Sequence, residues 1–260
     1  MVEVFMDTKL FPQNESTLSA LEKLKDAVRS HGKIVVLTGA GISVPSGIPD
    51  FRSAHGLYST EYGKFSAEDI ISHDFFLSHV DVFYDFYKSK MLYPNAKPNA
   101  MHNLLARLEK EGKISLVITQ NIDGLHGAAG SKRVCELHGS VHRNHCERCG
   151  KFFDLDYIAS SNGVPKCDEC GGIIKPDVVL YGEMLDSKDL KNAVNALVDA
   201  DMLIVIGTSL VVYPAAGLCE YFGGDTTVLI NKSSTYMDAR ADILINEDCA
   251  LVAEWLDKNL

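Results

Sequence analysis

The sequence is poor in positive charge and has neither a long apolar run nor a basic leader. Its 260 residues include 25 Lys and Arg against 35 Asp and Glu, which gives a net charge of −10. A protein that binds the phosphate backbone needs a basic face, so we expect no nucleic-acid partner. No stretch approaches the roughly 20 apolar residues of a membrane span, and the start lacks a basic segment followed by an apolar one. We therefore expect no membrane partner, no secretion signal and a cytoplasmic location.

Apolar, β-branched runs alternate with helix-like stretches along the chain. Hydrophobic residues make up 46% of the sequence and charged residues 23%, which is typical of a globular protein. Strand-like runs lie at 33–39, 114–119, 202–207, 227–230 and 242–245, and helical patterns at 16–30, 99–111 and 186–200. We expect Ser16 or Thr17 to cap the first helix. The alternation predicts an α/β fold, a Rossmann-like parallel sheet with helices on both faces and its ligand beyond the carboxyl ends of the strands.

Two stretches break this alternation. Residues 54–92 are rich in aromatic side chains and predict a helical cover over one side of the site. Residues 141–175 hold paired cysteines, several glycines and little strand-like apolar length. We therefore expect a small domain, formed by 54–92 and 141–175, inserted into a larger Rossmann-like domain formed by 1–53, 93–140 and 176–260.

Four of the seven cysteines form the pattern C-x2-C-x17-C-x2-C, whose spacing is typical of a structural zinc ribbon. Two such turns aim four sulfurs at one ion and leave no position for water, so the predicted role of the zinc is structural. The predicted ligands are Cys146, Cys149, Cys167 and Cys170. His142 and His145 lie nearby as rival ligands. Three cysteines have no partner at metal spacing and are expected to be buried: Cys135, Cys219 and Cys249.

Glycine and hydroxyl residues follow three of the strand-like runs. Gly39 and Gly41 are spaced as at the start of a dinucleotide fingerprint, but Val44 occupies the third position, and a tight strand-to-helix turn explains these glycines equally well. Gly-Thr-Ser at 207–209 follows another run, and Asn231 ends a third. Such residues can bind phosphates and ribose hydroxyls. The pattern therefore favours an NAD-like ligand, but it does not favour a classical dehydrogenase.

Polar side chains also follow the run at 114–119. Gln120, Asn121 and Asp123 lie at or just past its carboxyl end, where amide and carboxylate groups are costly to bury without a ligand or a network. His138 comes just before the cysteine module, and histidine is the side chain best suited to take a proton near neutral pH. Position alone does not single it out from the other histidines.

Together these blocks resemble the signature motifs of the sirtuins, which are NAD-dependent protein deacylases. The motifs are the two C-x2-C pairs, Asn231, GAGISVPSGIPDFR at 39–52, TQNIDGLH at 119–126, LHGS at 137–140, VVLYGE at 178–183 and GTSLVVYPA at 207–215. They run in the family's order from residue 39 onward. The pattern is most similar to bacterial deacetylases of the undifferentiated class, and the resemblance implies that the larger domain binds NAD.

The resemblance also implies which residues form the site. His138 matches the catalytic base, and Asn121 matches a second catalytic residue beside the nicotinamide ribose. The residues that match NAD contacts are Ala40, Ser43, Val44, Asp50, Phe51, Arg52, Gln120, Asn121, Ile122, Asp123, His138, Thr208, Ser209, Asn231, Lys232 and Cys249. The residues that match the strand pairing with the substrate peptide are Val179, Leu180, Gly182 and Glu183.

The same resemblance implies the reaction. Nicotinamide leaves C1′ of NAD, the acyl oxygen of a modified lysine attacks that carbon, and neutral His138 removes a ribose hydroxyl proton so that the 2′-oxygen attacks the imidate. Phe51 is expected to exclude water, and Asp123 to accept a hydrogen bond from the carboxamide. The expected enzyme is an NAD-dependent deacetylase of acetyl-lysine in a protein or peptide. It releases nicotinamide and O-acetyl-ADP-ribose.

The acyl preference depends on one departure from the family pattern. Relatives that remove succinyl or malonyl groups carry Tyr-x-x-Arg, in which the arginine binds the extra carboxylate. The apparent counterpart here runs from Tyr84 to Tyr87 and has no arginine, although Lys88 lies beside it. We therefore predict that acetyl-lysine is preferred over acidic acyl-lysines.

Several alternatives remain open. The same cofactor would serve a protein ADP-ribosyltransferase or a deacylase for longer or acidic acyl groups. A non-enzymatic NAD-binding module is disfavoured because Arg52, Asn121, Asp123 and His138 occur together. A DNA-binding zinc ribbon is disfavoured by the acidic total and by the scarcity of Lys and Arg around the cysteine pairs.

Overall fold

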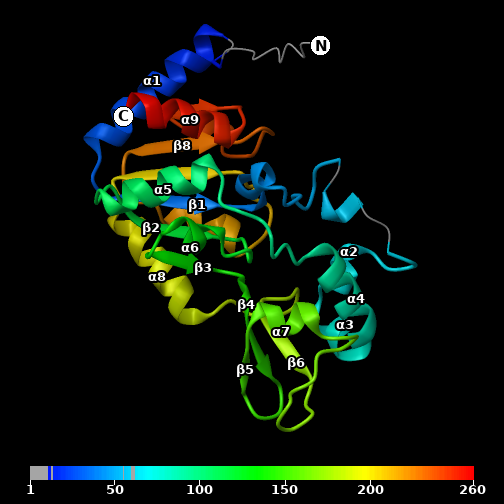
Figure 1. The fold of residues 1–260 in the computed structure, drawn as a ribbon. Coiled ribbons are helices and arrows are strands. Elements are labelled where there is room, and N and C mark those ends of the chain that lie inside the picture. The colour runs from blue at the N-terminus through cyan, green and yellow to red at the C-terminus, as the bar shows by residue number, and fades with distance from the viewer. Residues whose placement is uncertain (1–10, 13, 55, 60–61) are drawn as a thin grey trace, which may run out of the picture.

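A six-stranded parallel sheet forms the larger part of the computed structural model, which describes residues 11–12, 14–54, 56–59 and 62–260. Residues 1–10, where no secretion signal was expected, lie outside the described residues. The strands are β1 (Ile34–Thr38), β2 (Ile114–Thr119), β3 (Val134–Glu136), β7 (Met202–Ile206), β8 (Thr226–Ile230) and β9 (Ile243–Ile245). Their order in space is β3-β2-β1-β7-β8-β9 (Figure 1). The predicted α/β class and its parallel sheet are therefore confirmed.

Alternate side chains of the central strands enter two separate cores. Every residue of β1 and β7 is buried, as in a parallel sheet covered on both faces. Ile34 and Val36 pack toward one face, and Val35 and Leu37 toward the other. The chain leaves β1 toward β2 on one side, while β7 pairs with β1 on the other. The crevice of such a sheet lies where the strand order reverses, beyond the carboxyl ends of these strands.

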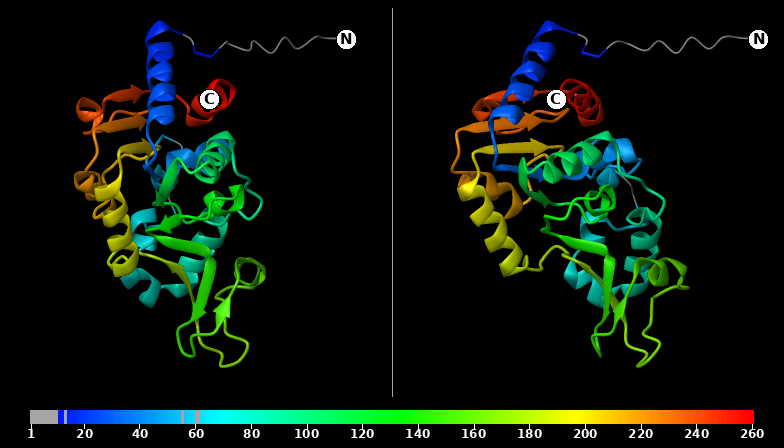
Figure 2. Two further views of the ribbon diagram at one scale, coloured as in Figure 1. Left: turned by 90° about the vertical axis from the view of Figure 1, so that its left-hand side faces the viewer. Right: turned by 60° about the vertical axis from the view of Figure 1, so that its left-hand side comes forward.

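Helices cover both faces of the sheet, as predicted (Figure 2). One core contains α1 (Glu15–Ser30), α5 (Ala100–Lys110) and α9 (Cys249–Asn259), and the other contains α8 (Ser187–Asp199) and η3 (Ala215–Tyr221). The shorter helices of this part are η1 (Ala40–Ser46), α6 (Leu125–Ala129) and η4 (Asp238–Arg240). The predicted cap of α1 was wrong. Asn14 is the N-cap, because its side chain accepts the Thr17 N–H and the Ser16 hydroxyl (both 2.7 Å).

A second, antiparallel sheet lies beyond the larger one, in the order β5-β4-β6. It consists of β4 (Gly139–Cys146), β5 (Phe152–Phe153) and β6 (Ile174–Val178), next to α7 (Leu155–Ser160). These strands were not recognised in the sequence of 141–175, because the outward-facing polar side chains of β4 interrupt its apolar pattern. Both β4 and β6 run across the predicted boundaries at 140/141 and 175/176.

The aromatic stretch forms the expected helical cover, made of η2 (Leu57–Ser59), α2 (Ala67–Ile70), α3 (His73–Ser78) and α4 (Val80–Lys90). Phe83 and Tyr87 are fully buried, and their rings stack with centroids 5.5 Å apart. They share one core with Phe153 and Ile174 of the small sheet. The aromatic side chains therefore join the helical cover to the cysteine module. None of the helices described is long and apolar enough to cross a bilayer.

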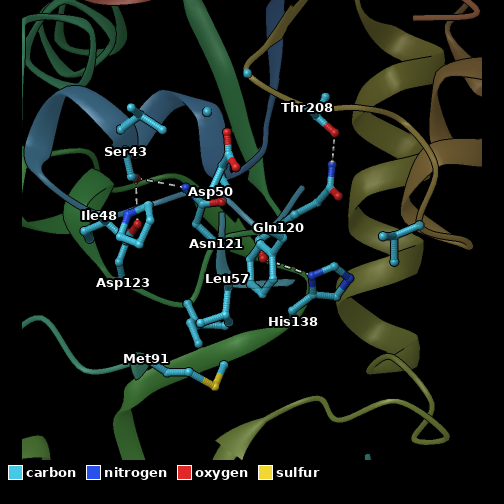
Figure 3. A pocket seen from close by; sticks show the side chains of 18 of the residues that line it. Ser43, Ile48, Asp50, Leu57, Met91, Gln120, Asn121, Asp123, His138 and Thr208 are labelled. Carbon is cyan, nitrogen blue, oxygen red and sulfur yellow. Dashed lines mark hydrogen bonds between the residues drawn. The ribbon is translucent and has the colours of Figure 1, made fainter. Parts of the chain in front are cut away.

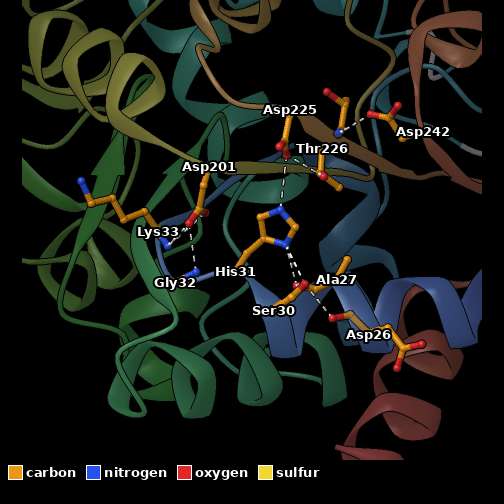
Figure 4. A network of polar contacts seen from close by, with 11 residues as sticks. Asp26, Ala27, Ser30, His31, Gly32, Lys33, Asp201, Asp225, Thr226 and Asp242 are labelled. Atoms are coloured by element: carbon orange, nitrogen blue, oxygen red, sulfur yellow. Dashed lines mark hydrogen bonds and ion pairs between the residues drawn. The ribbon is translucent and has the colours of Figure 1, made fainter.

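At the amino edge of the large sheet, where its parallel strands begin, polar groups of the chain hydrogen-bond to one another (Figure 4). The Asp201 carboxylate accepts the N–H groups of Gly32 and Lys33, each at 3.0 Å. His31 Nδ1 donates to the carbonyl of Ala27 at 2.8 Å, at the end of α1. The Asp201 bonds satisfy backbone groups that precede β1 and tie them to the start of β7, and the His31 bond lies at the end of α1.

Candidate active site

A cavity of about 760 Å³ lies beyond the carboxyl ends of β1, β2, β7 and β8. It also reaches the segment that follows β6 and the N-terminus of α9. Every residue predicted from the sequence to contact NAD or the peptide lines this cavity. Its volume falls within the ordinary range of a small-molecule site. The fold thus brings together residues from 40 to 249 around one space.

Glycine is required in the loop after β1 because its backbone closely approaches that of the loop after β7. The Gly41 N–H donates to the carbonyl of Gly207 at 2.7 Å. A Cβ placed on Gly41 would lie 2.7 Å from the Gly207 Cα, and one on Gly39 would lie 2.9 Å from the Gly207 carbonyl oxygen. Gly207 itself has φ +61°, which favours glycine. The loops after β1 and β7 therefore meet backbone to backbone at the floor of the cavity.

Three polar side chains, two of them buried and Asp123 half-buried, form one network at the ends of β1 and β2 (Figure 3). The Ser43 hydroxyl donates to Asp123 Oδ2 at 2.7 Å and accepts from Asn121 Nδ2 at 3.0 Å. Asp123 Oδ1 accepts the N–H of Leu125 at 2.9 Å, which fixes the carboxylate. Among the residues described, the Asn121 side-chain oxygen has no partner in the protein, so it is available to a ligand.

A second set of polar contacts joins the ends of β2, β7 and β8. Gln120 Nε2 donates to Thr208 Oγ1 at 3.0 Å (Figure 3). Asn231 Nδ2 donates to the carbonyl of Thr208 at 3.1 Å. Lys232 pairs with Asp248 at 2.7 Å, so its ammonium lies at the rim of the cavity. These amides and hydroxyls offer both donors and acceptors, which suits ribose hydroxyls.

His138 has one ring nitrogen held by the backbone. Its Nδ1 donates to the carbonyl of Gln120 at 2.9 Å (Figure 3). Burial lowers the pKa of His138 below its usual 6.5, and the bond to the carbonyl opposes this only in part. The imidazole is therefore neutral at pH 7, with its proton on Nδ1. The lone pair on Nε2 is left to accept a proton, which is the state required of a general base.

The segment after β6 presents free backbone groups to the cavity. The Glu183 carboxylate is turned inward, where it accepts the Leu180 N–H and a bond from His73 Nδ1, both at 2.8 Å. Within the described part of the chain, the Val179 carbonyl and the Gly182 N–H make no backbone hydrogen bond. The segment can therefore add an extended peptide through its backbone, while the Glu183 side chain holds it in place.

Two buried histidines behind the cavity were not predicted from the sequence. His126 Nε2 bonds to Thr38 Oγ1 at 3.0 Å, and the His102 ring lies edge-on to it with centroids 4.9 Å apart. Burial lowers the pKa of His102 to about 4 and that of His126 to about 3. Both rings are neutral near pH 7. Spacing could not reveal the pair, because it joins α5 to α6.

The residues interpreted as an acyl-pocket pair do not line the cavity. Tyr84 and Tyr87 point into the aromatic core, where the Tyr84 hydroxyl donates to the carbonyl of Ile174. Lys88 Nζ donates to the carbonyls of Ser161 and Gly163, each at 2.7 Å. That interpretation was wrong, because the packing of α4 against the small sheet decides where these side chains point. Apolar residues that the sequence analysis missed line the cavity instead: Ile48, Leu57, Ile71, Met91, Val141 and Leu155.

The four paired cysteines converge at the far end of the small sheet. Their sulfurs all lie within 4.8 Å of one another, with 3.4 Å between Cys146 and Cys170 and 3.6 Å between Cys149 and Cys167. Four thiolates around zinc at about 2.3 Å are separated by about 3.8 Å, so the cluster fits one tetrahedral ion. Neither rival histidine belongs to the cluster. His142 lines the cavity instead.

Comparison with known proteins gives concordant results. Residues 39–214 match the model of the Sir2 family. An NAD-dependent protein deacetylase of Clostridium acetobutylicum is 53% identical over 239 residues, which cover 91% of this chain and 98% of that protein. A Sir2 structure with a deacetylated p53 peptide and 3′-O-acetyl-ADP-ribose has a TM-score of 0.85 at 41% identity, covering 92% of this chain and 98% of that one. A Sir2 complex with a p53 peptide and NAD+ has a TM-score of 0.81 at 41% identity and the same coverage.

Proposed function

Because this chain belongs to the Sir2 family and is an NAD-dependent protein deacetylase that yields O-acetyl-ADP-ribose, we propose that His138 is its general base and acetyl-lysine in an extended peptide its substrate. The observation that carries this proposal is the neutral His138 ring, whose Nδ1 is held by Gln120 and whose Nε2 is free. The same cavity is lined by the free backbone groups of the segment after β6.

The residues present fit NAD by their chemistry. When bound, NAD supplies the ribose C1′ to which the acyl oxygen transfers as nicotinamide leaves. The Asn121 and Asp123 side chains, preset by Ser43, bind the nicotinamide and its ribose. The loop that begins at Gly39, together with Ser209 and Asn231, binds the rest of the dinucleotide. These side chains are already held by protein contacts, so little ordering is needed on binding.

His138 moves one proton. Its Nε2 takes the proton of a ribose hydroxyl, and the charge that develops on the ring is stabilised by the Nδ1–H bond to the carbonyl of Gln120. General-base assistance of this kind contributes about 10²–10⁴-fold in rate. Phe51 lines the cavity and excludes water from the reacting centre.

The protein substrate binds as an added strand. The Val179 carbonyl and the Gly182 N–H are the groups that would bond to the acetyl-lysine and its neighbours. Solved Sir2 structures of the same fold bind acetylated peptides. The four-cysteine zinc site has no open position and therefore acts structurally, and its thiolates favour a reducing, cytoplasmic location. The separate aromatic core supports the division into a larger NAD-binding domain and a small domain at 54–92 and 141–175, whose second segment we extend to 139–178 so that it contains the whole of β4 and β6.

A panel of acyl-lysine peptides tests the proposal. Nicotinamide release is measured with and without peptide and NAD, and the products are identified by mass spectrometry. We expect release to require both, and acetyl-lysine to be consumed faster than succinyl-lysine, because apolar side chains of the cavity lining, such as Met91, Val141 and Leu155, offer no partner to a second carboxylate. A peptide that gains ADP-ribose instead of losing acetyl would contradict the proposal, and faster desuccinylation would contradict the acyl preference.

A further inference from the structure

Two tyrosines meet across the mouth of the cavity. Tyr58 lies in η2, just after the loop that carries Phe51 and Arg52, and Tyr181 lies in the segment after β6. Their hydroxyls are 2.7 Å apart, a hydrogen bond in which either can donate. None of the roles assigned above uses either hydroxyl. The bond therefore links the NAD side of the site to the peptide side.

The Tyr181 end of this bond is anchored in the small domain. The Tyr181 N–H donates to the carbonyl of Ile71 at 3.0 Å, and its carbonyl accepts the His73 N–H at 2.9 Å. Glu183, two residues on, is held by His73 and by an ion pair with Lys175 at 3.1 Å. The backbone on both sides of Tyr181 is therefore fixed before any peptide binds.

The Tyr58 end is joined to the loop that carries Phe51 and Arg52. Its N–H donates to the carbonyl of Phe51 at 2.9 Å, and its ring meets the Phe51 ring edge-on with centroids 5.4 Å apart. The Arg52 guanidinium lies 5.2 Å from the centre of the same ring. A group that holds Tyr58 therefore also sets Phe51 and Arg52 in the cavity. Burial raises the pKa of Tyr58 well above its usual range, so its hydroxyl keeps its proton at working pH.

We propose that Tyr181 is a positioning residue that holds Tyr58 and, through it, keeps Phe51 over the reacting centre. The inference rests on the proposed function, because it assigns Phe51 the exclusion of water. Without the tether, water would attack C1′ in place of the acyl oxygen, so that NAD and water give ADP-ribose, nicotinamide and a proton. Tyr181 also lies within the segment that adds the peptide strand, so the same contact couples NAD cleavage to the presence of peptide.

The contribution of the two hydroxyls can be tested without removing either ring. Tyr181→Phe and Tyr58→Phe keep both rings and delete one partner each. We expect each variant to raise the KM for NAD about twofold to tenfold, the range of one net hydrogen bond, and to raise the ratio of ADP-ribose to O-acetyl-ADP-ribose at initial rates. The double variant should be no worse than either single variant. Tyr157→Phe is the matched control, because its hydroxyl donates to the carbonyl of Lys166 at 2.8 Å outside the cavity.

Product partitioning separates positioning from general destabilisation. An unchanged product ratio in both single variants, or additive effects in the double variant, would overturn the tether. A wild-type protein that releases no nicotinamide would instead refute the proposed function. In that case the dissociation constant for NAD, measured by calorimetry, still tests the tether: Tyr181→Phe should weaken binding, and equal affinity would overturn it.

Discussion

The two edges of the large sheet use polar side chains in opposite ways. At the amino edge, the Asp201 carboxylate is occupied by two backbone N–H groups of its own chain (Figure 4). At the carboxyl edge, the polar side chains hold one another in place yet leave atoms free, such as Nε2 of His138 and the side-chain oxygen of Asn121 (Figure 3). The first arrangement stabilises the fold, while the second keeps unsatisfied groups in position for a ligand. Substitutions at the two edges should therefore affect different measurements.

The largest effect is expected at the zinc site, which lies outside the large sheet and supports its carboxyl edge through β4. His138 directly precedes β4, and β4 ends at the zinc ligand Cys146. The substitution Cys170→Ser should release the metal and unfold the small sheet, because structural zinc binding is coupled to folding. Activity should then be lost indirectly. Zinc content, circular dichroism and deacetylation check this, with Cys135→Ser as the control that retains zinc. A zinc-free variant that stayed folded and active would refute the structural role.

The next largest effect is expected on kcat, which should depend on the carboxyl edge and not on the amino edge. His138→Ala should lower kcat by about 10²–10⁴-fold, because the general base is lost, while the free energy of unfolding falls by no more than about 1 kcal/mol, the net contribution of its one bond to Gln120. The matched control is His31→Ala at the amino edge, which should leave kcat unchanged. Substantial turnover by His138→Ala would remove the general-base assignment.

Acid should act on the two edges in different pH ranges. The folded-state pKa values of His102, His126 and His138 lie below 6.5, so the unfolded chain binds more protons and stability falls as pH drops below 6.5. Each group can lower the free energy of unfolding by up to about 1.4 kcal/mol per pH unit until its own pKa is reached. At the amino edge, bonds from Thr226 and His31 lower the pKa of Asp225, so its contribution is lost only below pH 3.8.

Urea unfolding at a series of pH values between 7.5 and 5 measures this difference. A free energy of unfolding that does not change over that interval would contradict the buried, neutral state of the histidines. His126→Gln should make the slope shallower, because one of the three groups no longer titrates.

The smallest effect is expected at the amino edge. Asp201→Ala should lower the free energy of unfolding by about 1–2 kcal/mol, because two backbone N–H groups lose their acceptor at a partly exposed site. Asp201→Asn keeps one acceptor oxygen and should lose less. Neither variant should change the KM for NAD, and an altered KM would show that the edges are not independent.

Sequence patterns predicted the parts of the fold that depend on local periodicity. The runs that became β1, β2 and β7 are buried on both faces at nearly every position, so they are mostly apolar and are easily recognised. The small sheet was missed because β4 has no regular alternation of buried and exposed residues, shifts register between Ser140 and Asn144, and includes the polar residues His142 and Arg143. The acyl-pocket assignment failed because helical spacing cannot say against which surface α4 packs.

The sequence by itself determined the parallel sheet and the metal ligands, because burial and ligand spacing leave short-range signatures, and its resemblance to the sirtuins indicated the polar residues of the cavity. Only the tertiary structure decided which atoms in that cavity are engaged and which are free. Ser43 meets Asp123 and Tyr58 meets Tyr181 across 80 and 123 positions of chain. Such contacts depend on how loops from different strands pack, and no local pattern of residues specifies that packing.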